Sequence, residues 1–204
     1  GYQEFWSLKI NVTPDVLIPR ADTELLVETA LEKLAEVPSP TILELGTGSG
    51  AIALALASER SDCQIFASDY STKALDVAKS NQKQLNLPNI NFIHSNWYES
   101  IPNQQFDLII SNPPYIDPDD SHMKTGIRFE PLEALCADNH GISDLALIIN
   151  KANDYLTRSG WILLEHGHDQ GDTITELLRQ ANLLEVRCLK DLAGNDRTSI
   201  GQIV

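Results

Sequence analysis

Residues 112–115, with the sequence Asn-Pro-Pro-Tyr, combine groups that could hold a planar amine for chemistry. They follow residues 106–110, a short apolar run rich in Ile and Leu that is typical of a buried strand. Two consecutive prolines cannot continue a central strand, because neither has an N–H to donate and each fixes φ. We therefore expect the strand to end in a rigid corner whose carbonyls point away from the sheet.

Such a corner suits methyl transfer from a sulfonium to a nitrogen whose lone pair is delocalised. The transfer is an in-line displacement, so that lone pair must point at the methyl carbon. The Asn112 side-chain oxygen and the Pro113 carbonyl would bind the two amine hydrogens, fix the plane and favour a pyramidal nitrogen. Tyr115 could pack on the substrate plane and stabilise positive charge developing at nitrogen. The structural alternative is a turn that ends the strand and buries its Tyr.

A glycine-rich loop joins an expected strand over residues 41–45 to an expected helix over residues 51–59. Glycines allow a tight turn and a close approach of the backbone to a ligand, with a helix N-terminus behind them. The spacing is G-x-G-x-G and differs from the dinucleotide fingerprint G-x-G-x-x-G. The alternative is a purely structural turn. The residues expected to bind a cofactor here are Glu44, Gly46, Thr47, Gly48, Ser49 and Gly50.

Asp69, Asn96 and Trp97 would extend this site to a nucleoside. Asp69 follows the glycine loop by about 20 residues, at the end of the next strand, where a carboxylate can accept from ribose hydroxyls. At the same edge of the sheet, Trp97 could lie against adenine and Asn96 could bind its edge. The alternatives are a solvated Asp and a rim aromatic. Glu44 would repel a pyrophosphate and favour a sulfonium, so the pattern indicates S-adenosylmethionine rather than NAD.

Strands that alternate with helices would position these groups. This order predicts an α/β fold with a mostly parallel, seven-stranded sheet covered on both faces, whose last two strands pair antiparallel. Strands are expected over residues 41–45, 64–68, 90–94, 106–110, 161–165, 183–189 and 198–204. Helices are expected over residues 51–59, 71–86, 145–156 and 169–181, the third closed by Gly160. Residues 116–140 form a long polar loop, which is usually functional or mobile in a compact domain.

Residues 1–40 are expected to form a β-hairpin and a helix that lead into a methyltransferase domain over residues 41–204. The hairpin would pair residues 8–12 with residues 16–18 across a Thr-Pro-Asp turn. Asp22 is a plausible N-cap for the helix that follows.

Composition and net charge exclude further classes of protein. With 42% hydrophobic and 22% charged residues, the chain of 204 residues is typical of one globular domain. No apolar run approaches the roughly 20 residues of a membrane span, and no leader signal opens the chain. Cys63, Cys136 and Cys188 lack metal-ligand spacing, so we expect reduced thiols, a cytoplasmic location and no metal. The net charge of −14 disfavours nucleic acid and favours a basic partner, although it could serve solubility alone.

The sequence resembles the glutamine N(5)-methyltransferases of peptide chain release factors over residues 3–204. The Asn-Pro-Pro-Tyr corner alone also occurs in methyltransferases that act on adenine or cytosine in nucleic acid. The segments at residues 17–24 and 165–167 are far more specific to the release-factor family. The matching segments are residues 4–6, 17–24, the glycine loop, 68–69, 111–116, 130–131, 134–135, 165–167, 170–171 and 191–197.

This resemblance implies a Rossmann-like class I S-adenosylmethionine-dependent methyltransferase, here a monomer, that methylates the glutamine of a Gly-Gly-Gln loop in release factors. It implies a catalytic corner of Asn112, Pro113 and Tyr115, with Pro114 also at the substrate and Asn112 also at the cofactor. Arg20 matches a family arginine at the cofactor end of the site, or is a surface charge.

Two departures from the family are visible. Asn96 stands where the family often has Asp, and its side-chain oxygen can still accept from the adenine amine. Family members carry a small N-terminal helical domain before this region, so we expect the chain, which begins with Gly1, to be part of a longer one.

Two other functions remain open at this point. A DNA or RNA amine methyltransferase would use the same corner on a flipped base and would need a basic groove. Residues 116–140 contain only Lys124 and Arg128 as basic residues, which disfavours that function. A non-catalytic scaffold that binds the cofactor would have a degraded corner or glycine loop, and both are intact.

Overall fold

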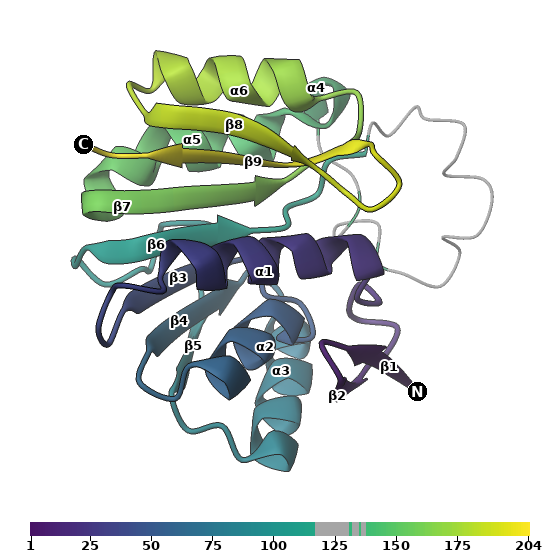
Figure 1. Ribbon diagram of the computed structural model, residues 1–204. Coiled ribbons are helices and arrows are strands. Elements are labelled where there is room, and N and C mark those ends of the chain that lie inside the picture. Colours follow the sequence, from purple (N-terminus) through teal and green to yellow (C-terminus); the bar gives the residue numbers. More distant parts are fainter. Residues whose placement is uncertain (117–130, 132–134, 136–137) are drawn as a thin grey trace.

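The computed structural model describes residues 1–116, 131, 135 and 138–204, and its centre is a seven-stranded sheet (Figure 1). The strand order is β5-β4-β3-β6-β7-β9-β8, and only β9 runs antiparallel to its neighbours. The prediction of a mostly parallel sheet with an antiparallel C-terminal strand is confirmed. The strands are β3 (Thr41–Leu45), β4 (Gln64–Asp69), β5 (Ile90–His94), β6 (Phe106–Ser111), β7 (Leu156–Glu165), β8 (Leu184–Lys190) and β9 (Asp196–Gln202).

Helices cover both faces of the sheet. Neighbouring residues of one strand enter opposite cores: Leu108 and Ile110 pack under α1 and α2, while Ile109 packs under α5 and α6. This alternation explains why the strands are apolar at nearly every position. The helices are η1 (Ala21–Thr23), α1 (Glu24–Lys33), α2 (Ala51–Glu59), α3 (Thr72–Leu85), α4 (Asp138–Gly141), α5 (Ser143–Tyr155) and α6 (Gly171–Gln180).

Helix α2 is buried on all sides from Ala51 to Ala57, because it contacts α1, α3 and the sheet. Its composition of Ala, Ile and Leu fits this central position. Among the described residues, no helix is long and apolar enough to cross a membrane.

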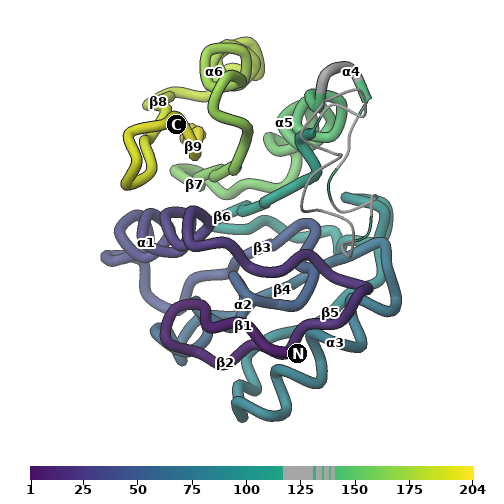
Figure 2. Tube along the Cα trace, turned by 90° about the vertical axis from the view of Figure 1, so that its right-hand side faces the viewer, coloured from purple at the N-terminus to yellow at the C-terminus, as the bar shows by residue number. Residues whose placement is uncertain are grey.

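The N-terminal hairpin exists, but its predicted position was wrong. It pairs β1 (Tyr2–Phe5) with β2 (Leu8–Asn11), and residues 13–18 form no strand. Trp6 and Ser7 make the turn, both with positive φ, as a two-residue hairpin turn of type I′ requires. No Gly or Asn marks this turn, and tertiary contacts support it: the Trp6 amide and indole donate to Glu24 and Glu59, both at 2.8 Å. Figure 2 shows the hairpin lying against α2 and α3.

Two helix ends also differ from the predictions. Asp22 lies in η1, and the N-cap of α1 is Thr23, whose side chain makes no capping bond. Helix α5 ends at Tyr155 and β7 begins directly at Leu156, so Gly160 lies inside a strand, beside a shift in register with β6. Residues 138–141 form α4, inside the segment predicted to be a loop, and Cys136 lies outside the described residues.

Candidate active site

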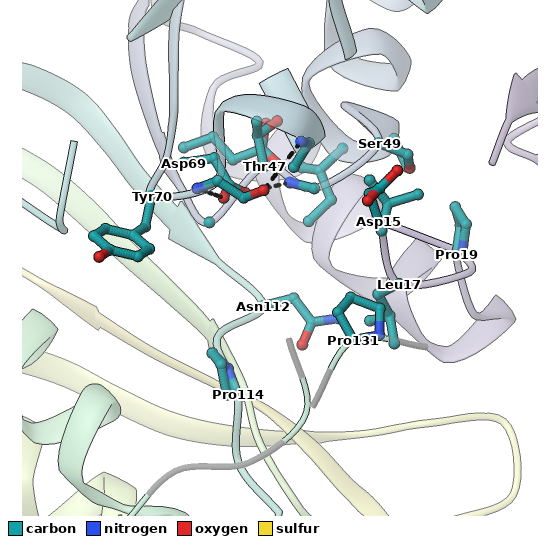
Figure 3. A pocket seen from close by; sticks show the side chains of 18 of the residues that line it. Asp15, Leu17, Pro19, Thr47, Ser49, Asp69, Tyr70, Asn112, Pro114 and Pro131 are labelled. Atoms are coloured by element: carbon teal, nitrogen blue, oxygen red, sulfur yellow. Dashed lines mark hydrogen bonds between the residues drawn. The ribbon is translucent and has the colours of Figure 1, made fainter. Parts of the chain in front are cut away.

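A cavity of about 270 Å³ lies at the carboxyl ends of β3, β4 and β6 (Figure 3). This is the edge of a parallel sheet where such folds bind ligands. Asp69 and Asn112 face it from opposite sides, and Asp15 lies beside it. Of the predicted site residues, the structure brings together Glu44, Gly46, Thr47, Gly48, Ser49, Asp69, Asn96, Trp97, Asn112 and Pro114 in its lining.

The glycine loop is held against the end of β4. The amides of Gly46 and Thr47 both donate to the Ser68 carbonyl at 2.9 Å. The Gly48 amide donates to Asp69 Oδ2 at 2.8 Å, and the Ser71 amide donates to Asp69 Oδ1 at 2.8 Å. Each carboxylate oxygen retains a lone pair for a ligand hydroxyl. Burial raises the pKa of Asp69, and these backbone hydrogen bonds oppose that rise.

Glu44 forms part of the cavity wall behind the glycine loop and is almost fully buried. Its Oε2 accepts from the Thr47 hydroxyl at 2.8 Å and from the Ala53 amide at 3.1 Å, which ties the loop to the first turn of α2. Burial raises the pKa of Glu44 to about 8. A cation bound beside it would favour the charged carboxylate.

Asn96, Trp97 and Asp144 form another part of the lining. The Trp97 ring lies against Gly46, where an added Cβ would meet the ring at 3.6 Å. Its indole nitrogen donates to Asp144 Oδ1 at 3.2 Å, which fixes the ring plane. The Asn96 amide nitrogen donates to Glu99 at 3.0 Å, so its oxygen is left as an acceptor.

The corner after β6 presents two residues to the cavity, Asn112 and Pro114. Asn112 Nδ2 donates to the Thr23 hydroxyl at 3.2 Å. Pro113 is buried and lies outside the cavity lining, so the predicted role of its carbonyl stays a prediction. Before the corner, the buried Ser111 hydroxyl donates to the Leu45 carbonyl at 2.6 Å, which holds the ends of β6 and β3 together.

Three further predicted residues lie outside the lining. Tyr115 is directed toward β7, where its hydroxyl donates to Glu165 Oε1 at 3.1 Å. Its predicted contact with the substrate plane stays a prediction. Gly50 is the N-cap of α2, behind the loop, with a left-handed φ of 85°. Arg20 is exposed just before η1.

Sequence reasoning missed many of the residues around the cavity, including some from the N-terminal segment and from two helix starts. Asp15, Val16, Leu17 and Pro19 come from the segment between the hairpin and η1. Thr23 and Asp144 come from helix starts. The matching segment at residues 17–24 was the available signal for Leu17, Pro19 and Thr23. Among the described residues, no cluster of His, Cys, Asp or Glu could hold a metal ion.

Comparisons with known proteins agree with this arrangement. A family model described as "Methyltransferase small domain" matches residues 21–134. The chain is 45% identical over 206 residues to the release factor glutamine methyltransferase of Aliivibrio fischeri, covering 100% of this chain and 72% of the relative. It is 46% identical over 203 residues to the Escherichia coli protein of the same name, covering 99% and 73%. A solved protein-(glutamine-N5) methyltransferase from Alicyclobacillus acidocaldarius is 30% identical, with a TM-score of 0.56 over 95% of this chain and 98% of that one.

Proposed function

Because the chain belongs to the release factor glutamine methyltransferase family, we propose that it methylates the side-chain amide nitrogen of the glutamine in the Gly-Gly-Gln motif of release factors. The methyl donor is S-adenosylmethionine, and the product is S-adenosylhomocysteine. The observation that carries the proposal is that one cavity is lined both by the glycine loop with Asp69 and by Asn112.

The residues around the cavity fit the donor's parts. Asp69 offers acceptor sites for ribose hydroxyls beyond its two backbone bonds. Trp97 offers an indole face, and Asn96 an acceptor oxygen, for an adenine. Glu44 is a buried acid that accepts from Thr47 of the glycine loop, and it suits the positive charges of an ammonium and a sulfonium. When bound, S-adenosylmethionine supplies an electrophilic methyl group.

The Asn-Pro-Pro-Tyr corner, hereafter the acceptor corner, positions the substrate amide. The Asn112 side chain uses its N–H₂ group on Thr23, so its oxygen is free to accept an N–H of the substrate. Holding the amide plane aims the nitrogen lone pair at the methyl carbon, which converts a poor nucleophile into an oriented one. No general base is needed before transfer, because the proton can leave afterwards. Arg20 is proposed at the cofactor end, and residues 1–40 as the part that leads into the methyltransferase domain.

The protein partner is a release factor, and the charge of the chain supports this assignment. A net charge of −14 suits a basic partner, and a release factor that binds ribosomal RNA carries basic patches. The same charge opposes direct nucleic-acid binding, because the phosphate backbone would be repelled. We therefore propose a monomeric, cytoplasmic enzyme that acts on protein.

A labelled-transfer assay tests the proposal. The chain is incubated with methyl-labelled S-adenosylmethionine and a release factor that carries either Gln or Ala in its Gly-Gly-Gln loop. Label on the Gln protein alone is the expected result. Equal labelling of both proteins would rule out the glutamine as acceptor. Label on an adenine-containing oligonucleotide would favour a nucleic-acid methyltransferase, and cofactor binding without any transfer would favour a scaffold.

A further inference from the structure

Behind the acceptor corner, outside the cavity lining, lies the buried carboxyl group of Glu165 at the end of β7. Its Oε1 accepts from the Tyr115 hydroxyl at 3.1 Å. Its Oε2 is buried and accepts no hydrogen bond from the part of the chain that the structure describes. A buried carboxylate oxygen without a hydrogen-bond donor lowers the stability of the fold, so the presence of Glu165 at this position needs a reason.

Thr23 connects this carboxyl group to the other side of the corner. Its hydroxyl accepts from Asn112 Nδ2 at 3.2 Å, which leaves its own hydrogen available. The same hydroxyl lowers the pKa of Glu165, which places it near the carboxyl group, and the empty Oε2 is the oxygen that could accept its hydrogen. If the Thr23 hydroxyl gives that hydrogen to Glu165, both hydrogen bonds point the same way, with Asn112 donating to Thr23 and Thr23 donating to Glu165.

This direction decides which end of the Asn112 amide faces the cavity. With the N–H₂ group bound to Thr23, the oxygen is the end that can meet a substrate N–H. If the amide were reversed, two donors would face each other across the cavity and the substrate plane would not be held. Tyr115, the other side chain of the corner, is tied to the same carboxyl group.

We propose that Glu165 and Thr23 are positioning residues for the transfer: Glu165 anchors Tyr115 directly and, through the Thr23 hydroxyl, fixes the Asn112 amide with its oxygen toward the cavity. The inference rests on the proposed function for its kinetic effects. Its structural content, the orientation of the Asn112 amide, can be measured without any substrate.

Charged and titratable groups from three elements face Glu165. They are Tyr115 after β6, Asp22 in η1 and Arg197 in β9. Arg197 is largely buried and donates to Asp191 Oδ2 at 3.2 Å, and its charge favours the ionised Glu165. Desolvation is nevertheless the strongest influence and raises the pKa of Glu165 to about 7. The charged form, which can accept from both hydroxyls, is therefore lost as the pH falls below that value.

The experiment compares Thr23→Val, which removes the hydroxyl at nearly constant shape, with Thr23→Ser, which keeps it. We expect Thr23→Val to lower kcat about 10- to 100-fold, the effect of an unsatisfied buried partner, and Thr23→Ser to stay within about threefold of the wild type. Binding of S-adenosylhomocysteine, measured by calorimetry, should change little in either variant. Wild-type kcat for both variants would overturn the proposal.

Glu165→Gln provides a second test, because an amide offers one acceptor oxygen where the carboxylate offers two. In the wild type, kcat should rise with pH through about 7, as Glu165 ionises. In Glu165→Gln, kcat should be low and this rise should disappear. A rise that persists in the variant would assign it to another group and contradict the role of Glu165.

A nuclear magnetic resonance measurement separates this inference from the proposed function. In protein labelled with ¹⁵N-Asn, the Asn112 side-chain signal is identified by its loss in Asn112→Ala. We expect its hydrogen exchange to be slow in the wild type and in Thr23→Ser, and fast in Thr23→Val. If the wild type labels no release factor, the proposed function fails while this readout still decides the orientation. Equal exchange rates of the Asn112 side-chain amide in all three proteins would contradict this inference and leave the proposed function standing.

Discussion

The Gly48 amide donates to the Asp69 carboxylate at 2.8 Å, so the glycine loop and the acid at the end of β4 form one unit. These residues are 21 positions apart in the sequence. The bond explains why the acid must sit at the end of β4: it shapes the loop and faces the cavity with the same group. The conformation of the glycine loop and the position of the Asp69 carboxylate therefore depend on each other.

Asp69→Asn should weaken cofactor binding. The amide would place an N–H₂ group against either the Gly48 or the Ser71 amide, both of which donate to Asp69 now. One donor facing another costs about 1–3 kcal/mol, so the Kd for S-adenosylhomocysteine should rise about 10-fold or more. Calorimetry measures the change. Asp76→Asn, an exposed site on α3, is the matched control, and equal affinities for both variants would contradict the role of Asp69.

Asn112→Ala should remove methyl transfer while it preserves the fold. The variant loses the acceptor oxygen at the cavity, and loss of one such oriented group typically costs about 100-fold or more in kcat. The labelled-transfer assay measures activity, and thermal unfolding measures the fold. Asn103→Ala, on an exposed loop before β6, should retain full activity. Substantial turnover by Asn112→Ala would remove this residue from the catalytic corner.

Glu44→Gln should stabilise the empty protein at alkaline pH. Burial raises the pKa of Glu44 from 4.5 to about 8, so the folded chain binds this proton more tightly than the unfolded chain. The resulting stability is fully present below about pH 4.5 and is lost as the pH rises through about 8. Gln keeps an oxygen for the Thr47 hydroxyl and the Ala53 amide, and it carries no charge at any pH.

The free energy of unfolding, measured with urea, should therefore be higher for Glu44→Gln than for the wild type at pH 9, by on the order of 1–3 kcal/mol. The two proteins should converge near pH 5. Glu36→Gln, at an exposed position, controls for a change in net charge. A constant difference across this pH range would show that Glu44 does not titrate as its burial requires.

Gly141→Ala should destabilise the fold and displace the corner. A Cβ at this position would clash with the Tyr115 carbonyl oxygen, and φ is +78°. Gly194→Ala is a close control, because its φ is +85° but nothing lies within 4 Å of the added Cβ. Both variants incur the backbone cost of about 1 kcal/mol, and only Gly141→Ala adds a clash of about 1–3 kcal/mol. Urea unfolding measures both, and equal losses would show that the corner moves freely.

Much of the fold could be predicted from the spacing of apolar residues and from the glycine or polar residues that end the apolar runs. Thr41–Leu45, Ala51–Glu59 and Ile90–His94 have the predicted bounds, because apolar runs end at glycine or polar residues there. Ser71 caps α3 as predicted, accepting from the Ala74 amide at 3.2 Å. The hairpin was misplaced because its turn, Trp6-Ser7, depends on contacts with Glu24 and Glu59 and has no local signal. Long-range hydrogen bonds leave no pattern in a short window of sequence.

By itself, the sequence determined the alternation of strands and helices, the glycine loop, and the corner after β6, because each depends on neighbours in the chain. Only the tertiary structure decided which residues these groups contact and which of them are buried. It placed Thr23 against Asn112, 89 residues apart, and directed Tyr115 to Glu165, 50 residues apart. It also buried Glu44 and Glu165, which raises the pKa of both carboxyl groups. Orientation and desolvation depend on which surfaces meet, and only the folded chain specifies that.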